Sequence, residues 1–166
     1  MRAYRIIVRS LSLLFAASAA AAALAGCTSS KGPFLMIEVC LKDAAGVSGF
    51  KQEMQVVAQS HGMMLVDDSE LQESNLDALD KIATPDLRKT IARPVVNMVL
   101  RDGDEVMVIV GNIGLPTGQV VVSFFDSSTS LDSHEFADMV VDRLAKKWRI
   151  EVVPQGQGAQ GIAGCS

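Results

Sequence analysis

Residues 95–110 read VVNMVLRDGDEVMVIV, two runs rich in apolar and β-branched residues on either side of a short polar turn. Because Asp-Gly favours the tight turns that join antiparallel strands, Asp102-Gly103 predicts a type I′ hairpin. A loop of these two residues places Arg101 opposite Asp104, so that a cation and a carboxylate pair across the strands. We assign the rest of the fold outward from this hairpin. The same register also predicts the pairs Met98 with Met107 and Val96 with Ile109.

Four more segments have the composition or the alternation of strands. In Phe34–Leu41, apolar residues at every second position predict a half-buried strand, with Glu38 and Cys40 on its other face. Another predicted strand, Gln119–Phe125, follows the hairpin after the glycine-rich segment Gly111–Gly118. The last two predicted strands are Met63–Val66 and Ile150–Val153.

Between the strands, three stretches predict helices. Apolar residues recur at helical spacing from about Ser48, and Gly62 is expected to end that helix. The polar segment Ser69–Arg93 predicts two helical pieces, the second beginning at Thr84-Pro85, because proline is favoured in a first turn after a threonine cap. Asp132 and Glu135 have the spacing of a capping box and predict the start of the last helix.

This order of elements predicts an α+β fold. We expect a single mixed β-sheet of about five to six strands, in the order β-α-β-α-β-β-β-α-β, with helices packed on it. Over most of residues 34–148 the chain resembles the amino-terminal domain of the Tol-system propeller protein. The resemblance lies in the element order, in Met64-Leu65-Val66-Asp67-Asp68 and in the late Leu/Val-rich helix.

That resemblance implies a TolB-N-like fold or a ferredoxin-like variant. Related domains occur in outer-membrane lipoproteins that activate peptidoglycan synthases or serve the flagellum, although those synthase activators have long tethers and this chain does not. The Gly111–Gln119 segment, with the strand and the Trp148 helix that follow, is also similar to a family of uncharacterised lipoproteins. The resemblances therefore imply a role in the cell envelope without implying an activity.

The first 26 residues have the layout of a secretory signal peptide. Arg2, Arg5 and Arg9 form a positive end, and an uncharged stretch rich in Leu, Phe and Ala follows. This stretch is short of the ~20 strongly apolar residues that a stable membrane span needs. We therefore expect residues 1–26 to be cleaved, in preference to a permanent transmembrane helix.

Leu24, Ala25, Gly26 and Cys27 resemble the lipobox of bacterial lipoproteins at every position. In that family the Cys thiol receives a diacylglyceryl group, the chain is cut before it, and the new amino terminus is usually acylated. The resemblance implies both lipids at Cys27, with an ordinary signal peptide as the alternative. Thr28, where an Asp would favour inner-membrane retention, favours the outer membrane. We expect a lipid-anchored protein that faces the periplasm.

Cleavage leaves a short tether, a single domain and a tail. Residues 27–33 contain the lipidated cysteine and the tether, residues 34–153 form the α+β globular domain, and residues 154–166 form a flexible Gly/Gln-rich tail. Removing three of the 15 basic residues with the signal peptide leaves 12 against 19 acidic residues, a net charge of −7. An acidic domain gives no indication of a nucleic-acid partner.

Besides Cys27, only Cys40 and Cys165 remain. In an oxidising compartment these two predict one disulfide, with two free thiols as the alternative. A Cys pair so far apart lacks the spacing of metal ligands, and His61 and His134 are also distant from each other. We therefore expect no metal and no cofactor other than the covalent lipid.

The sequence contains no recognisable catalytic set. It has no nucleophile elbow, and His134 is explained by its place in the first turn of a helix. The Gly111–Gly118 segment has an apolar tip that we expect to be exposed, which makes Asn112, Leu115 and Pro116 the candidates for contact with a protein partner.

The leading hypothesis is a non-catalytic binding or accessory module of the cell envelope, with the membrane and an envelope protein as partners. Two alternatives stay open. One is an enzyme acting on envelope polymers through paired carboxylates, Asp67 or Asp68 with one from the His134 helix. The other is an immunity-type lipoprotein that protects the cell.

Overall fold

The computed structural model describes residues 32–80, 95–112, 115–116, 118–128 and 131–165, without the side chains of 78–80. The chain divides into two units, Met1–Gly32 and Pro33–Ser166, and every helix and strand described below belongs to the second. The predicted signal peptide, the lipobox-like residues and the predicted tether as far as Lys31 lie outside the described residues. So does the helical piece predicted to begin at Thr84-Pro85.

The described residues form one six-stranded sheet and three helices, which confirms the α+β fold and the predicted order of elements. No helix among them is long and apolar enough to span a membrane. In chain order the elements are β1 (Leu35–Cys40), α2 (Ala44–Ser60), β2 (Met64–Asp67), α3 (Ser69–Asp80), β3 (Asn97–Asp102), β4 (Glu105–Gly111), β5 (Gln119–Phe124), α5 (Ser133–Ala145) and β6 (Arg149–Val152).

Within the described residues, the strands lie in the order β2-β3-β4-β5-β1-β6 and every neighbouring pair is antiparallel. The expected mixed sheet therefore has no parallel pair. The reason lies in the two helical crossovers. α2 connects β1 to β2, and α5 connects β5 to β6; each joins strands that run in the same direction but have other strands between them.

β3 and β4 form the predicted hairpin, but the predicted register was wrong. Asp102 pairs with Glu105, so the turn residues are Gly103 and Asp104, and Gly103 adopts a φ of 59°. Glycine at the first central position is the arrangement of type II′ turns. Past the turn, a β-bulge adds Met107 to β4, an extra residue that alternation in the sequence does not reveal. Met98 consequently pairs with Val110, and Val99 with Ile109.

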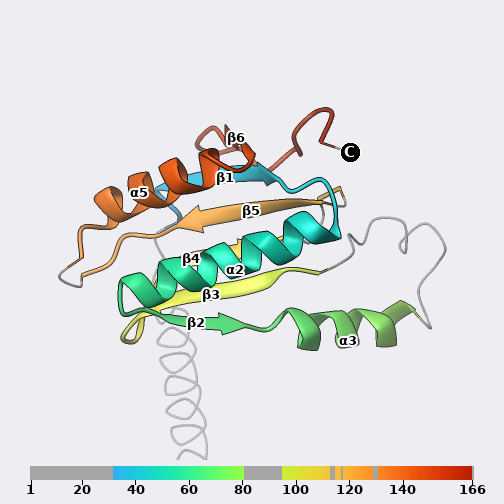
Figure 1. The fold of residues 1–166 in the computed structure, drawn as a ribbon, viewed down its shortest axis with the longest axis horizontal. Helices are drawn as coiled ribbons and strands as arrows, with labels where there is room; N and C mark the ends of the chain where they lie inside the picture. Colours follow the sequence, from blue (N-terminus) through green and yellow to red (C-terminus); the bar gives the residue numbers. More distant parts are fainter. Residues whose placement is uncertain (1–31, 81–94, 113–114, 117, 129–130, 166) are drawn as a thin grey trace, which may run out of the picture. The chain divides into compact units, whose positions relative to one another are not determined.

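α2 and α5 lie over the same face of the sheet (Figure 1). α2 begins at Ala44, before the expected Ser48, because the Asp43 carboxylate caps it by accepting a hydrogen bond from the Gly46 N–H at 2.8 Å. Asp132 caps α5 as predicted. The core between helices and sheet includes Phe50, Met54 and Val57 of α2, Phe136, Val140 and Leu144 of α5, and Ile37, Val39, Val122 and Phe124 of the strands.

The opposite face of the sheet is more open. The register places Val66, Val99 and Ile109 in one row on this face, and all three are partly or largely exposed. Alternation along β1 places Glu38 and Cys40 on the same face, where both are buried. The residues that bury them come from the end of the chain, and this region contains the candidate site.

Candidate binding site beside the Cys40–Cys165 disulfide

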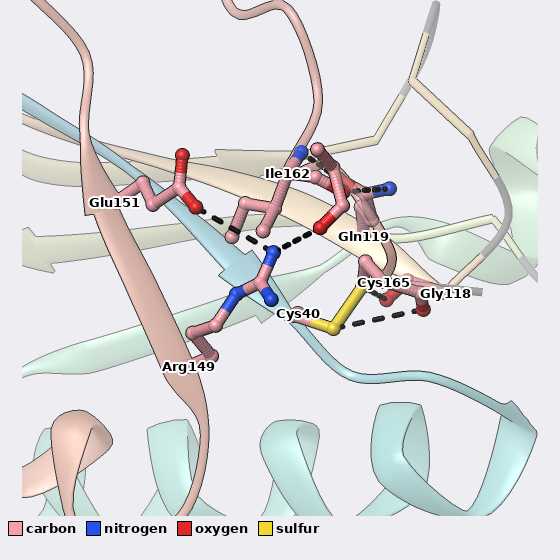
Figure 2. Close-up of a disulfide and its surroundings, with 8 residues drawn as sticks. Cys40, Gly118, Gln119, Arg149, Glu151, Ile162 and Cys165 are labelled. Carbon is pink, nitrogen blue, oxygen red and sulfur yellow. Dashed lines mark hydrogen bonds and ion pairs between the residues drawn. A yellow bond between two sulfur atoms is a disulfide. The ribbon is translucent and has the colours of Figure 1, made fainter.

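The structure joins Cys40 of β1 to Cys165, as the cysteine count predicts. Their sulfur atoms are 2.13 Å apart and their Cα atoms 5.5 Å apart, across 125 residues of sequence. Both cysteines are buried and form a small cluster with Ile162, separate from the main core. Figure 2 shows the disulfide and the hydrogen-bonded residues around it. The disulfide therefore links the end of the chain covalently to β1, an internal strand of the sheet.

Residues 154–165, which we expected to be flexible, are also held by hydrogen bonds. The Gly161 N–H donates to the Glu38 carboxylate at 2.9 Å, and the Ile162 N–H donates to the Gln119 side-chain oxygen at 2.5 Å. Glu38 and Gln119 are polar residues buried on the open face, so these N–H groups give them the partners that burial requires. The composition of the tail predicted flexibility, but its partners lie on strands far away in sequence.

Of the three candidate partner contacts, the structure leaves only Pro116 exposed. Asn112 is buried, and its side-chain oxygen accepts a hydrogen bond from the Val96 N–H at 2.9 Å. Leu115 is only 7% exposed, so the expectation that it forms an exposed tip was wrong. Pro116 packs against Gly161, where an added Cβ would lie 3.1 Å from its ring. The described part of the loop therefore contacts Val96, which lies just before β3, through Asn112 and the tail through Pro116.

A hollow of about 420 Å³ opens next to the disulfide, where the end of β1, the turn between α5 and β6, and the last residues of the chain meet. No feature of the sequence indicated it, because its walls come from three separate segments. The hollow is lined by Cys40, Leu41, Lys42, Lys147, Trp148, Arg149 and Gly164.

Lys147 and Arg149, two of the cations that line the hollow, have acidic neighbours. Lys147 and Arg143 both contact Glu53 of α2, whose side chain is 7% exposed. Hydrogen bonds from Lys147 and from Arg143 lower the pKa of the Glu53 carboxyl below its ordinary value. Arg149 donates to the Ala163 carbonyl and lies 3.5 Å from a Glu151 oxygen. The side chain of Lys42 has no hydrogen bond or ion pair within the described part of the chain.

Lys42 also has an unusual backbone conformation. Its φ of 68° lies in the left-handed region, and every other described residue with a positive φ is a glycine. For a residue with a side chain this conformation costs about 1–2 kcal/mol. The main chain here is held tightly, because the Gly118 carbonyl accepts hydrogen bonds from both the Leu41 N–H (2.7 Å) and the Lys42 N–H (3.1 Å).

The carboxylates proposed for an enzyme do not converge. Asp67 ends β2, an edge strand, whereas His134 contacts the Phe34 ring at the start of β1, with a centroid separation of 4.1 Å. β1 and β2 are four strands apart, about 19 Å at ~4.8 Å per strand. Burial opposes ionisation of Asp67, but hydrogen bonds from Ser69 and from Lys51 outweigh it and lower the pKa of its carboxyl. Asp67 thus has structural partners of its own.

Asp132 and Asp126, two acidic residues near His134, likewise have roles in the local structure. Hydrogen bonds from the N–H groups of Glu135 and His134 lower the pKa of Asp132, as expected for a helix cap. His134 lies 3.4 Å from an Asp126 oxygen, and both side chains are largely exposed. Within the described ranges, no three His, Cys, Asp or Glu side chains are grouped so that they could hold a metal ion.

Comparisons with known proteins identify no relative of this chain. No protein family model matches the chain, and no curated protein or solved structure is significantly similar to it.

Proposed function

We propose that the mature protein is a lipid-anchored protein of the bacterial outer membrane that faces the periplasm and acts as a non-catalytic binding or accessory module. The lipobox-like residues Leu24 to Cys27 supply the proposed anchor. Two or more lipid chains give stable attachment, since each buried methylene contributes about 0.8 kcal/mol. The tether of residues 28–33 then keeps the domain within ~20 Å of the membrane surface, at ~3.5 Å per residue.

The observation that carries the proposal is the Cys40–Cys165 disulfide. Disulfides persist in the periplasm and on cell surfaces and are rare in the reducing cytosol. This one joins β1, which has a strand on either side, to Cys165, and both cysteines are buried. A disulfide in this position supports export of the chain, which the signal peptide and the lipobox also imply.

A binding role is favoured over the carboxylate-dependent enzyme for a geometric reason. Asp67 lies on β2, four strands from β1, whose start His134 contacts through Phe34, and both Asp67 and Asp132 have local structural partners. In contrast, the hollow beside the disulfide presents cationic side chains and an aromatic wall in a domain whose overall balance is acidic. A concave surface of this kind suits recognition of a ligand.

The anchor is tested by comparing the wild type with Cys27→Ser and with the double variant Cys40→Ser/Cys165→Ser. In cells fed a labelled palmitate analogue, we expect label in the wild type and the double variant and none in Cys27→Ser. The purified wild type should begin at Cys27 and have the added mass of its acyl chains. A wild-type mass equal to that of the bare polypeptide, or a different first residue, contradicts the proposal.

The binding role is tested in intact cells with a photoreactive residue in place of Ala163, which is exposed near the hollow, and with Gln59, exposed on α2, as the control position. We expect a crosslinked adduct from position 163 that is lost when Cys27 is also replaced by serine. Equal adducts from both positions, or none from position 163, contradict a dedicated binding surface here.

A further inference from the structure

Among the described residues, the hollow beside the disulfide has more positive charge than its acidic neighbours neutralise. Lys42, Lys147 and Arg149 line it. Glu53 pairs with Lys147, and Glu151 lies beside Arg149. Lys42 has neither an acidic partner nor a hydrogen-bond partner for its side chain within the described residues. One cationic group is therefore available to an anion from outside.

The simplest explanation for these cations is that they stabilise the end of a helix. Cations near a helix C-terminus complement the negative end of its dipole, and this accounts for Lys146 and Lys147 after α5. It does not account for Lys42, which follows β1, or for Arg149, which begins β6. Two segments bring positive charge to one concave surface: the end of β1 with Lys42, and the turn into β6 with Lys147 and Arg149; only the second follows a helix.

The backbone at Lys42 adds a second reason. Glycine is the residue that best tolerates a left-handed conformation, and the described residues use glycine at every other such position. The backbone is held in this conformation by hydrogen bonds from the Lys42 N–H to the Gly118 carbonyl and from the Asp43 N–H to the Leu41 carbonyl, whereas the lysine side chain has no hydrogen bond within the described residues. Strained non-glycine residues cluster at ligand-binding and functional sites. At a position that favours glycine, Lys42 thus has an exposed side chain that is available for a contact from outside the domain.

The size and the walls of the hollow limit what it can hold. Its volume of about 420 Å³ is within the ~300–1,000 Å³ typical of small-ligand sites. This is more space than a bare phosphate or carboxylate fills, so the anion must be attached to a larger body. Trp148, which is partly buried, and Leu41 provide apolar walls for that body.

We infer that the hollow binds the carboxylate or phosphate group of a sugar-sized anionic ligand, with Lys42 as its principal electrostatic contact. Arg149 is the second cation, and Trp148 packs against the body of the ligand. The inference rests on the proposed function and deepens it, because a protein facing the periplasm is exposed to anionic saccharides of the envelope. Carboxylated and phosphorylated sugars share the chemistry that the hollow recognises, and the experiment separates them.

Trp148 makes the test direct, since it is the only tryptophan in the chain and it lines the hollow. The full mature protein, solubilised in a non-ionic detergent, is titrated with glucuronate, glucose 6-phosphate, glucose and inorganic phosphate while tryptophan fluorescence is followed. We expect a saturable change with glucuronate, glucose 6-phosphate or both, at least about tenfold weaker for glucose and for inorganic phosphate. The charged sugar that binds identifies the source of the anion. Equal responses to glucose and to both charged sugars, or no saturable response to any probe, overturn the inference.

The decisive variant is Lys42→Gly, which removes the cation and keeps a residue that tolerates the left-handed backbone. Loss of one charge-assisted contact predicts about tenfold or greater weakening of the charged sugar. Lys146→Gln is the control for charge, because it removes one positive charge from the turn after α5, next to Lys147, but Lys146 does not line the hollow. Lys42→Asn, also tolerant of this conformation, must weaken binding as Lys42→Gly does. Unchanged affinity for the charged sugar in both folded Lys42 variants contradicts the assignment.

A failure of ligand binding can be distinguished from a failure of the proposed lipid anchor. Cys27→Ser leaves the hollow intact, so this variant should bind the charged sugar as the wild type does. If Cys27 is lipidated but no sugar anion binds, only the present inference is wrong. If the anion binds but Cys27 has no lipid, the proposed location is wrong and the hollow remains a binding site.

Discussion

At the scale of single residues, the junction between β1 and β5 depends on how closely two backbones approach. The Gly118 carbonyl accepts two hydrogen bonds from the Leu41–Lys42 segment, and a Cβ added at Gly118 would lie 2.5 Å from the Lys42 carbonyl oxygen. Gly118 also has a positive φ of 78°. A side chain at position 118 would therefore both clash and strain the backbone, and the geometry of Lys42 depends on this glycine.

The burial of Leu115 can be tested by shortening its side chain. Because it is 7% exposed, Leu115→Ala should lower the free energy of unfolding by about 2–4 kcal/mol. Leu71→Ala is the matched control: Leu71 is 63% exposed, so the same change there should stay within about 0.5 kcal/mol. Urea unfolding curves of the three proteins measure both effects. Equal stability of the two variants would show that Leu115 is not part of the core.

At the scale of elements, α2 and α5 are coupled by charge as well as by apolar packing. Glu53 of α2 accepts hydrogen bonds from Arg143 of α5 and from Lys147, which follows it. The Trp148 ring packs edge-on against Phe50 of α2, with centroids 5.8 Å apart. The turn that forms one wall of the hollow is therefore attached to α2 by two kinds of contact.

Replacing Glu53 with glutamine tests this coupling through its pH dependence. At neutral pH, Glu53→Gln should cost about 1.5–3 kcal/mol, the range for hydrogen bonds to charged groups. The folded-state pKa of Glu53 lies below its ordinary value of 4.5. The stabilisation is therefore complete above that value and is lost as the pH falls through the folded-state pKa. Unfolding measured at several pH values should show the two proteins converging in acid, and a constant difference contradicts the assignment.

Prediction from sequence also succeeded and failed at this scale for physical reasons. Periodicity located the strands and helices, and the capping pattern of Asp132 located the start of α5, because these properties are local. The register of β3 and β4 was wrong, because the turn forms at Gly103-Asp104 and the bulge adds Met107, and both depend on how the two strands meet. The hollow was missed for the same reason, since Lys42, Trp148 and Gly164 come together only through the sheet order.

At the scale of the whole molecule, the end of the chain completes the sheet. β6 is an edge strand beside β1, and beyond it residues 154–165 return over the open face to Glu38, Gln119 and Cys40. Val153 begins this return by donating its N–H to the Met36 carbonyl at 2.9 Å. The final segment is therefore part of the domain.

Removal of the disulfide tests this view. The double variant Cys40→Ser/Cys165→Ser should be about 2–5 kcal/mol less stable than the wild type. Limited proteolysis of the folded variant should cut within the segment from Pro154 to Ala163 before it cuts the sheet, and mass spectrometry locates the cuts. The wild type under non-reducing conditions is the control. Identical cutting of the two proteins would mean that hydrogen bonds alone hold the segment in place.

The position of β1 between β5 and β6 also constrains how the chain folds. β1 is synthesised early, but its two neighbours are residues 119–124 and 149–152. The residues from Cys40 to Val152 take on the order of 10 s to synthesise, at roughly 5–20 residues per second. Contacts so distant in sequence give a high contact order, which slows folding. The apolar residues of β1 are without their neighbours for at least that interval, which makes the incomplete chain prone to aggregation until β6 is present.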